Sequence, residues 1–344
     1  MSANEPAPVL RINDLSVEFG RRQRSFLAVD NVSLSVGRGE TVGLVGESGS
    51  GKSTIGNAVL GLAPVKSGTI TFEGEDLTHA SASQRRAASA RLQVIFQDPY
   101  SSLNPSRTIR EILVEPLLVH EKLGKSEAVD RVGKMLERVG MDRSAGVRYP
   151  GHFSGGQRQR IAIARALMVS PDLVICDEAV SALDLSVQAQ VLNLLMSLQQ
   201  ELGMSYLFVS HDLTVVRHMS DRIVVLFHGR VMETGDAAAI HDRPAHPYTQ
   251  ALLSASPIPD PGQQREQRER ISLALAPARP QATTKRCPFA ARCPFATLIC
   301  EQVEPPLAPG PSGTLVACHH ADEAAAASVS IPNATASKIH RGVS

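Results

Sequence analysis

The sequence lacks the features that would place the chain in a membrane, in a secretory pathway or on a nucleic acid. No run of apolar residues approaches the roughly 18 that a membrane-spanning helix needs. The 35 Lys and Arg residues nearly cancel the 34 Asp and Glu residues, and a formal charge of +1 gives no support to binding nucleic acid or an acidic membrane surface. Residues 1–5 are polar, with no basic segment leading into an apolar one, so we expect no secretory signal. We therefore expect the chain to work in the cytosol, where thiols remain reduced.

Cysteine is also scarce, and its distribution is uneven. Of five cysteines, Cys176 stands alone in an apolar run, while the other four crowd the C-terminal part, at Cys287, Cys293, Cys300 and Cys318. In a reducing compartment such a group indicates metal binding before disulfides. The total of 344 residues suits one large domain with an appendage, or two domains.

Residues 46–53 form the strongest motif of the chain. They match G-x-x-x-x-G-K-[ST], a phosphate-binding loop, between an apolar strand predicted at 41–45 and a helix predicted at 54–60. Glycines let successive N–H groups face a phosphate, and the helix N-terminus adds positive potential. The flanking strand and helix disfavour the alternative of a plain glycine-rich turn. The predicted nucleotide-binding residues here are Gly46, Glu47, Ser48, Gly49, Ser50, Gly51, Lys52, Ser53 and Thr54.

Hydrolysis of a nucleoside triphosphate requires a magnesium site and a group that activates water. In the loop, Lys52 would reach the β- and γ-phosphates, and the Ser53 hydroxyl would bind Mg²⁺. A buried-type strand at 172–176 leads into Asp177, a further Mg²⁺ ligand, and Glu178, a general base. An acidic pair at a strand end is more often simply solvated, but a phosphate-binding loop on a neighbouring strand favours the catalytic interpretation.

A second glycine-rich turn lies ahead of a predicted helix. Ser154, Gly155, Gly156 and Gln157 resemble an anion site at a helix N-terminus. Without the phosphate-binding loop elsewhere in the chain, an ordinary loop would be the better interpretation.

Strands alternate with helices along most of the chain, which predicts a mostly parallel sheet covered by helices. Residues 98–170 are mostly of helical type, with Ser126 as a possible N-cap. A stripe at Val129, Val132, Met135, Leu136 and Val139 is predicted to face the core. Prolines break the periodicity after residue 243, and alanine and serine dominate without a pattern from residue 321 on.

The order of the motifs resembles that of the ATP-binding subunits of ABC transporters. Residues 46–53 look like Walker A, Gln97 like the Q-loop, residues 154–157 like the signature motif and Asp177-Glu178 like Walker B. Residues 181–184 look like the D-loop, and His211 resembles the switch histidine. The match covers residues 10–235. Outside this context, a lone histidine beside Asp212 would more often be a surface residue.

The resemblance implies a head-to-tail dimer with each ATP between Walker A of one subunit and the signature motif of the other. Ser154, Gly155, Gly156 and Gln157 would then contact the nucleotide of the partner. Gln97 would contact Mg²⁺ and sense a membrane subunit, while His211 would bind the γ-phosphate. Phe19 or Phe26 lies where an aromatic ring could stack on the base, and core packing is the equal alternative for Phe19.

Two positions depart from the family pattern. Phe153 stands where the family usually has Leu before the signature serine, which keeps an apolar anchor. Ala179 stands where a proline usually follows the glutamate. Because proline would fix φ at this position, its absence is expected to loosen Glu178.

Further motifs resemble the oligopeptide/dipeptide importers. They are Asn104-Pro105, residues 187–190, residues 246–253 and residues 180–184, the last resembling the F-type ATPase usually paired with a D-type one. This resemblance implies two membrane permease subunits and, indirectly, a periplasmic or extracellular substrate-binding protein, with no nucleic acid. In the same subfamily, cysteines like Cys287, Cys293, Cys300 and Cys318 can bind a [4Fe–4S] cluster. Zinc or free thiols are the alternatives.

We therefore expect an α/β P-loop NTPase with a mostly parallel sheet, an inserted helical subdomain and a small cysteine-containing C-terminal region. The predicted parts are an ATPase domain at 8–250 with its helical subdomain at about 98–170, a C-terminal region at 251–320 and a disordered tail at 321–344. The expected function is Mg²⁺-dependent ATP hydrolysis that drives peptide import, at the cytoplasmic face of the inner membrane. The alternatives are a soluble ABC-type ATPase outside transport and a regulatory module without turnover. The sequence leaves open the cargo and whether the dimer is a homo- or heterodimer.

Overall fold

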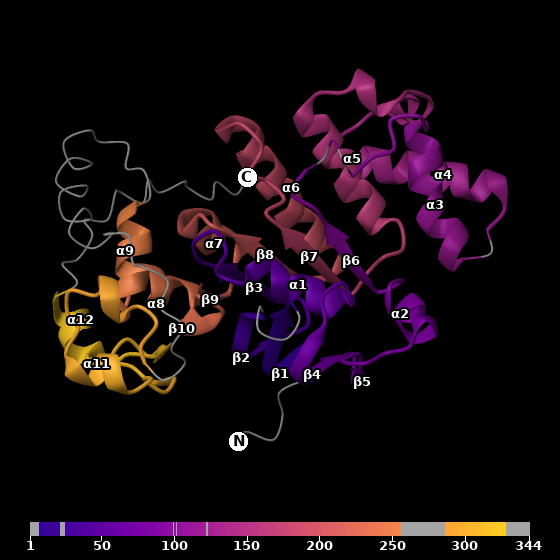
Figure 1. The fold of residues 1–344 in the computed structure, drawn as a ribbon. Helices are drawn as coiled ribbons and strands as arrows, with labels where there is room; N and C mark the ends of the chain where they lie inside the picture. Colours follow the sequence, from indigo (N-terminus) through magenta and orange to yellow (C-terminus); the bar gives the residue numbers. More distant parts are fainter. Residues whose placement is uncertain are drawn as a thin grey trace. The chain divides into compact units, whose positions relative to one another are not determined.

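The computed structural model describes residues 7–20, 25–98, 100, 102–121, 123–255 and 286–327 (Figure 1). The chain divides into two compact units, Met1–Val231 and Met232–Ser344. Each unit is described below by itself. Within the described ranges, no helix combines the length and apolar character needed to cross a bilayer.

The first unit contains an antiparallel sheet with the strand order β2-β1-β4-β5. Its strands are β1 (Leu10–Phe19), β2 (Phe26–Val36), β4 (Val65–Phe72) and β5 (Glu75–Asp76). Leu10 of β1 lies opposite Val36 of β2 on one side and Phe72 of β4 on the other. The apolar side chains of β1 belong to a buried cluster that also contains Ile55, Ala58 and Val59 of helix α1 (Lys52–Leu60), so the sheet packs against that helix.

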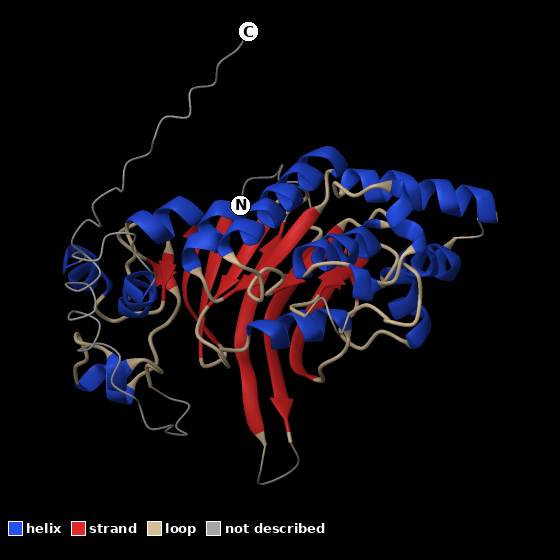
Figure 2. Cartoon of the chain, turned by 90° about the horizontal axis from the view of Figure 1, so that it is seen from above, coloured by secondary structure: helices blue, strands red, loops and turns tan. Residues whose placement is uncertain are grey.

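The first unit also contains a parallel set of strands in the order β9-β3-β8-β7-β6, which confirms the predicted fold class. The bounds are β3 (Thr41–Val45), β6 (Leu92–Ile95), β7 (Leu173–Asp177), β8 (Ser205–Ser210) and β9 (Arg222–Phe227). All residues of β3 and β8 are buried, as expected for parallel strands covered on both faces. Figure 2 shows helices (blue) on both sides of the strands (red). The carboxyl ends of β3, β7 and β8 lie at one edge, where the motif residues follow.

Helices connect these strands. Their bounds are α1 (Lys52–Leu60), α2 (Ala82–Ala88), α3 (Ile109–His120), α4 (Lys125–Arg138), α5 (Gly155–Leu167), α6 (Leu185–Leu202) and α7 (Leu213–Met219), with short 3-10 turns η2 (Arg143–Val147) and η3 (Pro150–His152). Helices α3, α4 and α5 pack on one another between β6 and β7 in the sequence, and Figure 1 shows them gathered together. Gly203 ends α6 in the left-handed conformation.

Two expectations for α4 were wrong. The helix begins at Lys125 with Gly124 as its N-cap, so Ser126 lies inside the first turn and caps nothing. Val129 is 42% exposed, because Ala128, four positions before Val132, occupies the buried position instead. The rest of the stripe is buried, as predicted: Val132, Met135, Leu136 and Val139.

The second unit is small and held by a short antiparallel ladder. Its elements are β10 (Arg230–Asp236), α8 (Ala237–Asp242), α9 (Pro247–Ala255), η4 (Ala290–Arg292), α11 (Leu298–Gln302), β11 (Ala308–Pro309), β12 (Leu315–Val316) and α12 (Ala321–Ala327). Glu233 of β10 lies opposite Val316 of β12. Tyr248 and Phe289 are fully buried with ring centroids 5.4 Å apart.

The buried Glu233 carboxylate joins three segments of this unit. It accepts hydrogen bonds from the Ala245 N–H (2.9 Å), the His246 N–H (3.1 Å) and the Thr314 hydroxyl (3.0 Å). Burial nevertheless raises the pKa of Glu233.

Two predicted boundaries differ from the structure. The compact C-terminal unit begins at Met232, ahead of the expected residue 251, because Tyr248 of α9 packs inside it against Phe289. Residues 321–327 of the predicted disordered tail form helix α12, with Asp322 and Glu323 in its first turn and Ala324 buried. The remainder of that predicted tail, 328–344, lies outside the described residues.

Candidate nucleotide-binding site

The glycine-rich loop connects β3 to α1 in the strand–loop–helix order that a phosphate site requires. Gly49 and Gly51 have φ values of 79° and 101°, a region that side chains with a Cβ rarely adopt. A Cβ on Gly51 would also lie 2.6 Å from the Ala28 carbonyl oxygen. The loop therefore keeps its backbone close to β2, and Gly51 serves as the N-cap of α1.

Lys52 is almost fully buried at the start of α1. Its Nζ donates to the carbonyl oxygens of Gly46 (2.8 Å) and Glu47 (2.9 Å), so the ammonium group lies against its own loop. Burial lowers the pKa of Lys52, and the negative charges of Glu178 and Asp177 act in the opposite direction. A phosphate oxygen that binds Lys52 has to compete with these two carbonyls.

Ser53 and Asp177 meet although they belong to distant parts of the sequence. The Ser53 Oγ donates a 2.8 Å hydrogen bond to Oδ1 of Asp177, at the carboxyl end of β7. Burial raises the pKa of Asp177, while the bond from Ser53 lowers it. A hydroxyl and a carboxylate side by side provide the hard oxygen ligands that Mg²⁺ prefers, so these residues fit the ion.

Glu178 occupies a strained backbone position. Its φ is 48°, in the left-handed region, and its N–H donates to the Val209 carbonyl of β8 (3.0 Å). Its own carbonyl accepts from the Ser181 Oγ (2.9 Å) and the Ser181 N–H (3.1 Å). Ala179 is fully buried in the same turn. These bonds hold the glutamate in place where the family's proline is missing.

His211 follows β8 and faces Glu178. Its Nδ1 lies 3.7 Å from Oε2 of Glu178, and the imidazole is largely exposed. The structure thus brings together five of the predicted residues at one edge of the parallel strands: Lys52, Ser53, Asp177, Glu178 and His211.

Comparison with known proteins matches two family models to the chain. One, described as ABC transporter, covers residues 29–181. The other, described as the C-terminal region of the oligopeptide/dipeptide transporter, covers residues 232–300. The chain is 46% identical over 314 residues to YkfD of Bacillus subtilis, which is named as an oligopeptide transport ATP-binding protein, and covers 95% of that relative with 91% of its own length. The chain belongs to the ABC transporter family, in its oligopeptide/dipeptide branch.

Two further matches agree. The oligopeptide transport ATP-binding protein AppF of Bacillus subtilis is 44% identical over 327 residues, with 93% of this chain and 99% of the relative covered. Among solved structures, the ATP-binding cassette MJ0796, a dimer in a post-hydrolysis state bound to ADP and Pi, matches with a TM-score of 0.61 and 27% identity. That match covers 66% of this chain and 98% of the cassette.

The four residues that match the ABC signature motif lie at the N-terminus of α5, where Ser154 and Gln157 are exposed and Gly155 and Gly156 are half-buried. The Ser154 side chain caps the helix by accepting from the Gln157 N–H (3.4 Å), and Oε1 of Gln157 accepts from the Ser154 N–H (3.0 Å). A Cβ on Gly156 would lie 2.4 Å from Cγ1 of Val187 on α6, so this glycine allows two helices to approach.

The other predicted nucleotide contacts lie at the ends of strands. Gln97 is exposed just after β6. Phe19 is 39% exposed at the end of β1 and pairs in register with Phe26, which is 60% exposed. The exposure of both rings leaves surface for stacking.

The four C-terminal cysteines do not form a metal-binding arrangement. All four are free and lie among the described residues, where no group of three or more His, Cys, Asp or Glu side chains has the geometry to hold a metal ion. Burial raises the pKa of Cys287 to about 11 and that of Cys293 to about 12, and the charges of neighbouring cysteines act in the same direction. The predicted cluster therefore does not fit this arrangement of side chains, although the Cys287 N–H donates to the Cys300 carbonyl (2.9 Å).

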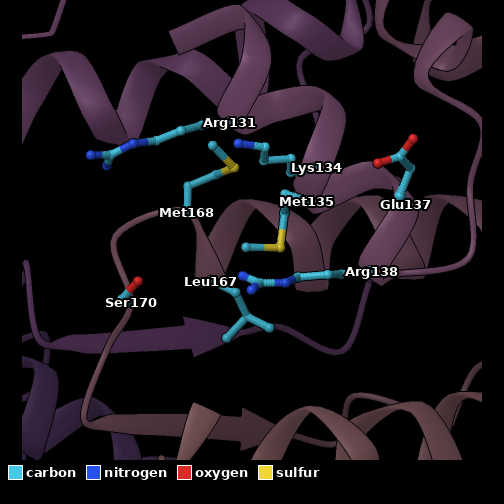
Figure 3. Close-up of a pocket in the computed structure, with 8 residues that line it drawn as sticks. All are labelled: Arg131, Lys134, Met135, Glu137, Arg138, Leu167, Met168 and Ser170. Carbon is cyan, nitrogen blue, oxygen red and sulfur yellow. The ribbon is translucent and has the colours of Figure 1, made fainter. Parts of the chain in front are cut away.

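A separate pocket of about 690 Å³ opens in the helical subdomain between α4 and the end of α5 (Figure 3). It contains none of the predicted nucleotide-binding residues. Arg131 is paired with Glu121 (2.7 Å) and Lys134 with Asp130 (2.8 Å). Its lining residues are Arg131, Lys134, Met135, Glu137, Arg138, Leu167, Met168 and Ser170.

Two residues with a structural part in the site were missed by sequence reasoning. Ser181 was assigned only to the D-loop, yet it holds the Glu178 turn. Tyr100 was not singled out, yet it contacts the signature helix. The Ser181 bond is a local turn contact across three residues, whereas the Tyr100 contact depends on how the segment before α3 folds back onto α5.

Proposed function

We propose that this chain is the ATP-hydrolysing subunit of a peptide importer and works with a separate membrane permease. The observation that carries the proposal is the Ser53–Asp177 and Glu178–His211 arrangement beside Lys52, in a chain whose relatives are named as oligopeptide transport ATP-binding proteins. Those names also disfavour an ATPase outside transport.

Phosphate binding begins with Lys52 and the loop backbone. Lys52 exchanges the Gly46 and Glu47 carbonyls for β- and γ-phosphate oxygens, while the N–H groups of residues 46–53 surround the phosphates. Ser53, Asp177 and, from the neighbouring strand end, Gln97 would hold Mg²⁺. When bound, the ion neutralises negative charge on the β- and γ-phosphates.

Glu178 is the general base. Its carboxylate accepts a proton from water as the water oxygen forms a bond to the γ-phosphorus and the bond to the β–γ bridging oxygen breaks. His211, 3.7 Å from that carboxylate, contacts the γ-phosphate and the base together. The fixed turn at Glu178 gives the base a defined direction, which supports turnover despite Ala179.

The exposed signature residues supply half of a shared site. In the proposed head-to-tail dimer, Ser154, Gly155, Gly156 and Gln157 bind the γ-phosphate of the nucleotide held by a second ATPase subunit, D-type in the heterodimer. Phe19 stacks on the adenine base. The assembly includes two permease subunits at the cytoplasmic face of the membrane and receives peptides from a substrate-binding protein. Support comes from the exposure of the α5 N-terminus and from the dimeric ATP-binding cassette with the same fold.

The [4Fe–4S] cluster that the resemblance implies stays a prediction. Binding it would require a different arrangement of the side chains of Cys287, Cys293, Cys300 and Cys318. Its support is the sequence resemblance alone, and no step of hydrolysis depends on it. Anaerobic purification followed by absorbance, iron and zinc analysis tests it. Colourless protein without iron would overturn the [4Fe–4S] prediction, and stoichiometric zinc would replace it.

The test of the proposed function is peptide-stimulated ATP hydrolysis by the chain assembled with its permease in vesicles. We expect phosphate release and peptide uptake to fall together by about 10²-fold or more in Glu178→Gln, with ATP binding retained. Uptake of peptide without this chain, or hydrolysis that no peptide stimulates, would contradict the proposal.

A further inference from the structure

The segment after Gln97 touches the signature helix through one aromatic residue. Tyr100 is 60% exposed, yet one face of its ring is covered by Arg158 of α5, whose guanidinium carbon lies 4.3 Å from the ring centroid. A Cβ built on Gly155 would lie 3.4 Å from the Tyr100 hydroxyl oxygen. The tyrosine therefore lies against the first turn of α5, where the signature motif is.

Arg158 extends this contact to the start of the motif. Its Nε donates a 3.0 Å hydrogen bond to the carbonyl oxygen of Phe153, which directly precedes the capping residue Ser154. Phe153 is itself buried, with the guanidinium of Arg148 lying 4.5 Å from its ring centroid. The Tyr100 ring, the Arg158 guanidinium and the Phe153 carbonyl form a continuous series of contacts.

The same segment is fixed to α5 at a second point. Arg165, about two helical turns after Arg158, donates from its guanidinium to the Ser102 carbonyl. At the other end, the Tyr100 N–H donates to Oδ1 of Asp98 (2.8 Å), next to Gln97. Tyr100 and Ser102 are thus each connected to α5, the first through Arg158 and the second through Arg165.

We propose that Tyr100 is a positioning residue for the signature motif: through Arg158 it fixes Phe153 and Ser154 relative to the Gln97 segment. The proposal rests on the proposed function, because its consequence lies in the ATP shared with a partner subunit. Through this contact, a movement of Tyr100, three residues after Gln97, would move the N-terminus of α5 with it. The proposal assigns Tyr100 no contact with the nucleotide of its own chain.

Three variants of the full-length chain test the proposal. Tyr100→Leu removes the ring, Tyr100→Phe keeps the ring on Arg158, and Arg158→Met removes the guanidinium. We expect hydrogen exchange at the Gln157 and Arg158 amides to rise about two- to fivefold in Tyr100→Leu and to stay at the parent rate in Tyr100→Phe. Adding Tyr100→Leu to Arg158→Met should change these exchange rates little, because the contact between the ring and the guanidinium is already lost.

The second measurement is ATP-driven dimerisation in a Glu178→Gln background, alone and with a second ATPase subunit. We expect Tyr100→Leu to weaken dimerisation about two- to fivefold, with unchanged ATP affinity of the single chain. Equal exchange and equal dimerisation in Tyr100→Leu and Tyr100→Phe would overturn the proposal. A parent that never dimerises would overturn the head-to-tail site instead, and the exchange measurement would still decide the role of Tyr100.

Discussion

Ser53 and Asp177 are 124 positions apart in the sequence, yet the Ser53 Oγ donates a 2.8 Å hydrogen bond to Oδ1 of Asp177. This bond joins the first turn of α1 to the end of β7, which β8 separates from β3. The two predicted magnesium ligands therefore lie together as a consequence of strand order.

Replacing either partner should weaken Mg²⁺ binding and raise the magnesium concentration that turnover requires. In Ser53→Ala we expect the Mg²⁺ concentration for half-maximal ATPase activity to rise at least about tenfold, and in Asp177→Asn to rise further. Ser53→Thr keeps the hydroxyl and should stay near the parent. Magnesium titrations of phosphate release measure this. An unchanged half-maximal concentration in Ser53→Ala would remove Ser53 from the site.

The Ser181 hydroxyl should matter for catalysis although it is assigned no contact with ATP. Ser181→Ala loses the 2.9 Å bond to the Glu178 carbonyl, so the strained turn loosens and kcat should fall about three- to tenfold with KM for ATP unchanged. Ser181→Thr should retain the bond and the rate. Steady-state kinetics decides between them, and a changed KM in Ser181→Ala would point to a direct nucleotide contact.

The close approach of α5 and α6 should make Gly156 sensitive to added volume. Gly156→Ala places its Cβ 2.4 Å from Cγ1 of Val187 and should lower the unfolding free energy by about 1–3 kcal/mol. The loss of unfolding free energy should be smaller in a Val187→Ala background, because the clashing methyl group is then absent. Gly151→Ala is the matched control, because nothing lies within 4 Å of its Cβ. Denaturant titration gives the values, and equal costs at 151 and 156 would contradict the packing argument.

His246 should make the C-terminal unit sensitive to acid. Its burial lowers the pKa to about 3, far below the usual 6.5, while its Nδ1 accepts from the Tyr248 N–H (2.9 Å). Between these values the unfolded chain binds a proton that the folded chain does not, so stability falls as pH drops below 6.5. The slope reaches up to about 1.4 kcal/mol per pH unit. Glu233 has a raised pKa and makes the opposite contribution: above pH 4.5 the folded chain keeps a proton that the unfolded chain loses, so this residue adds stability as the pH falls.

Melting temperatures of the full chain between pH 7.5 and 5 check this, with His246→Asn as the comparison that keeps an acceptor without a titrating group. A parallel pH dependence in the two proteins would assign the acid sensitivity to other residues.

The elements that could be predicted from the sequence are those with local signals. Gly51 and Gly203 mark the ends of helices through their own backbone conformations, and β3 is indicated by its short, mostly apolar run. Ser126 and Val129 were misjudged because Gly124 and Ala128, weaker signals in isolation, fit the cap and the buried position better.

Contacts that depend on the three-dimensional path of the chain could not be predicted in the same way. The bond from Ser181 to Glu178 is local, across three residues, but it forms only because Glu178 takes a left-handed backbone conformation that the sequence does not announce. The ring of Tyr100 meets Arg158 only because the segment before α3 folds onto α5. In both cases the residue types are ordinary and the geometry alone gives them a role.

The position of Cys176 has a consequence for oxidative chemistry. This thiol is fully buried in β7 directly beside Asp177, and burial raises its pKa. Because oxidants and alkylating reagents attack exposed thiolates, the cysteine nearest the predicted magnesium ligands is the most protected of the five. A thiol-specific reagent such as a maleimide should therefore modify Cys293 and Cys318, which are partly exposed, before Cys176.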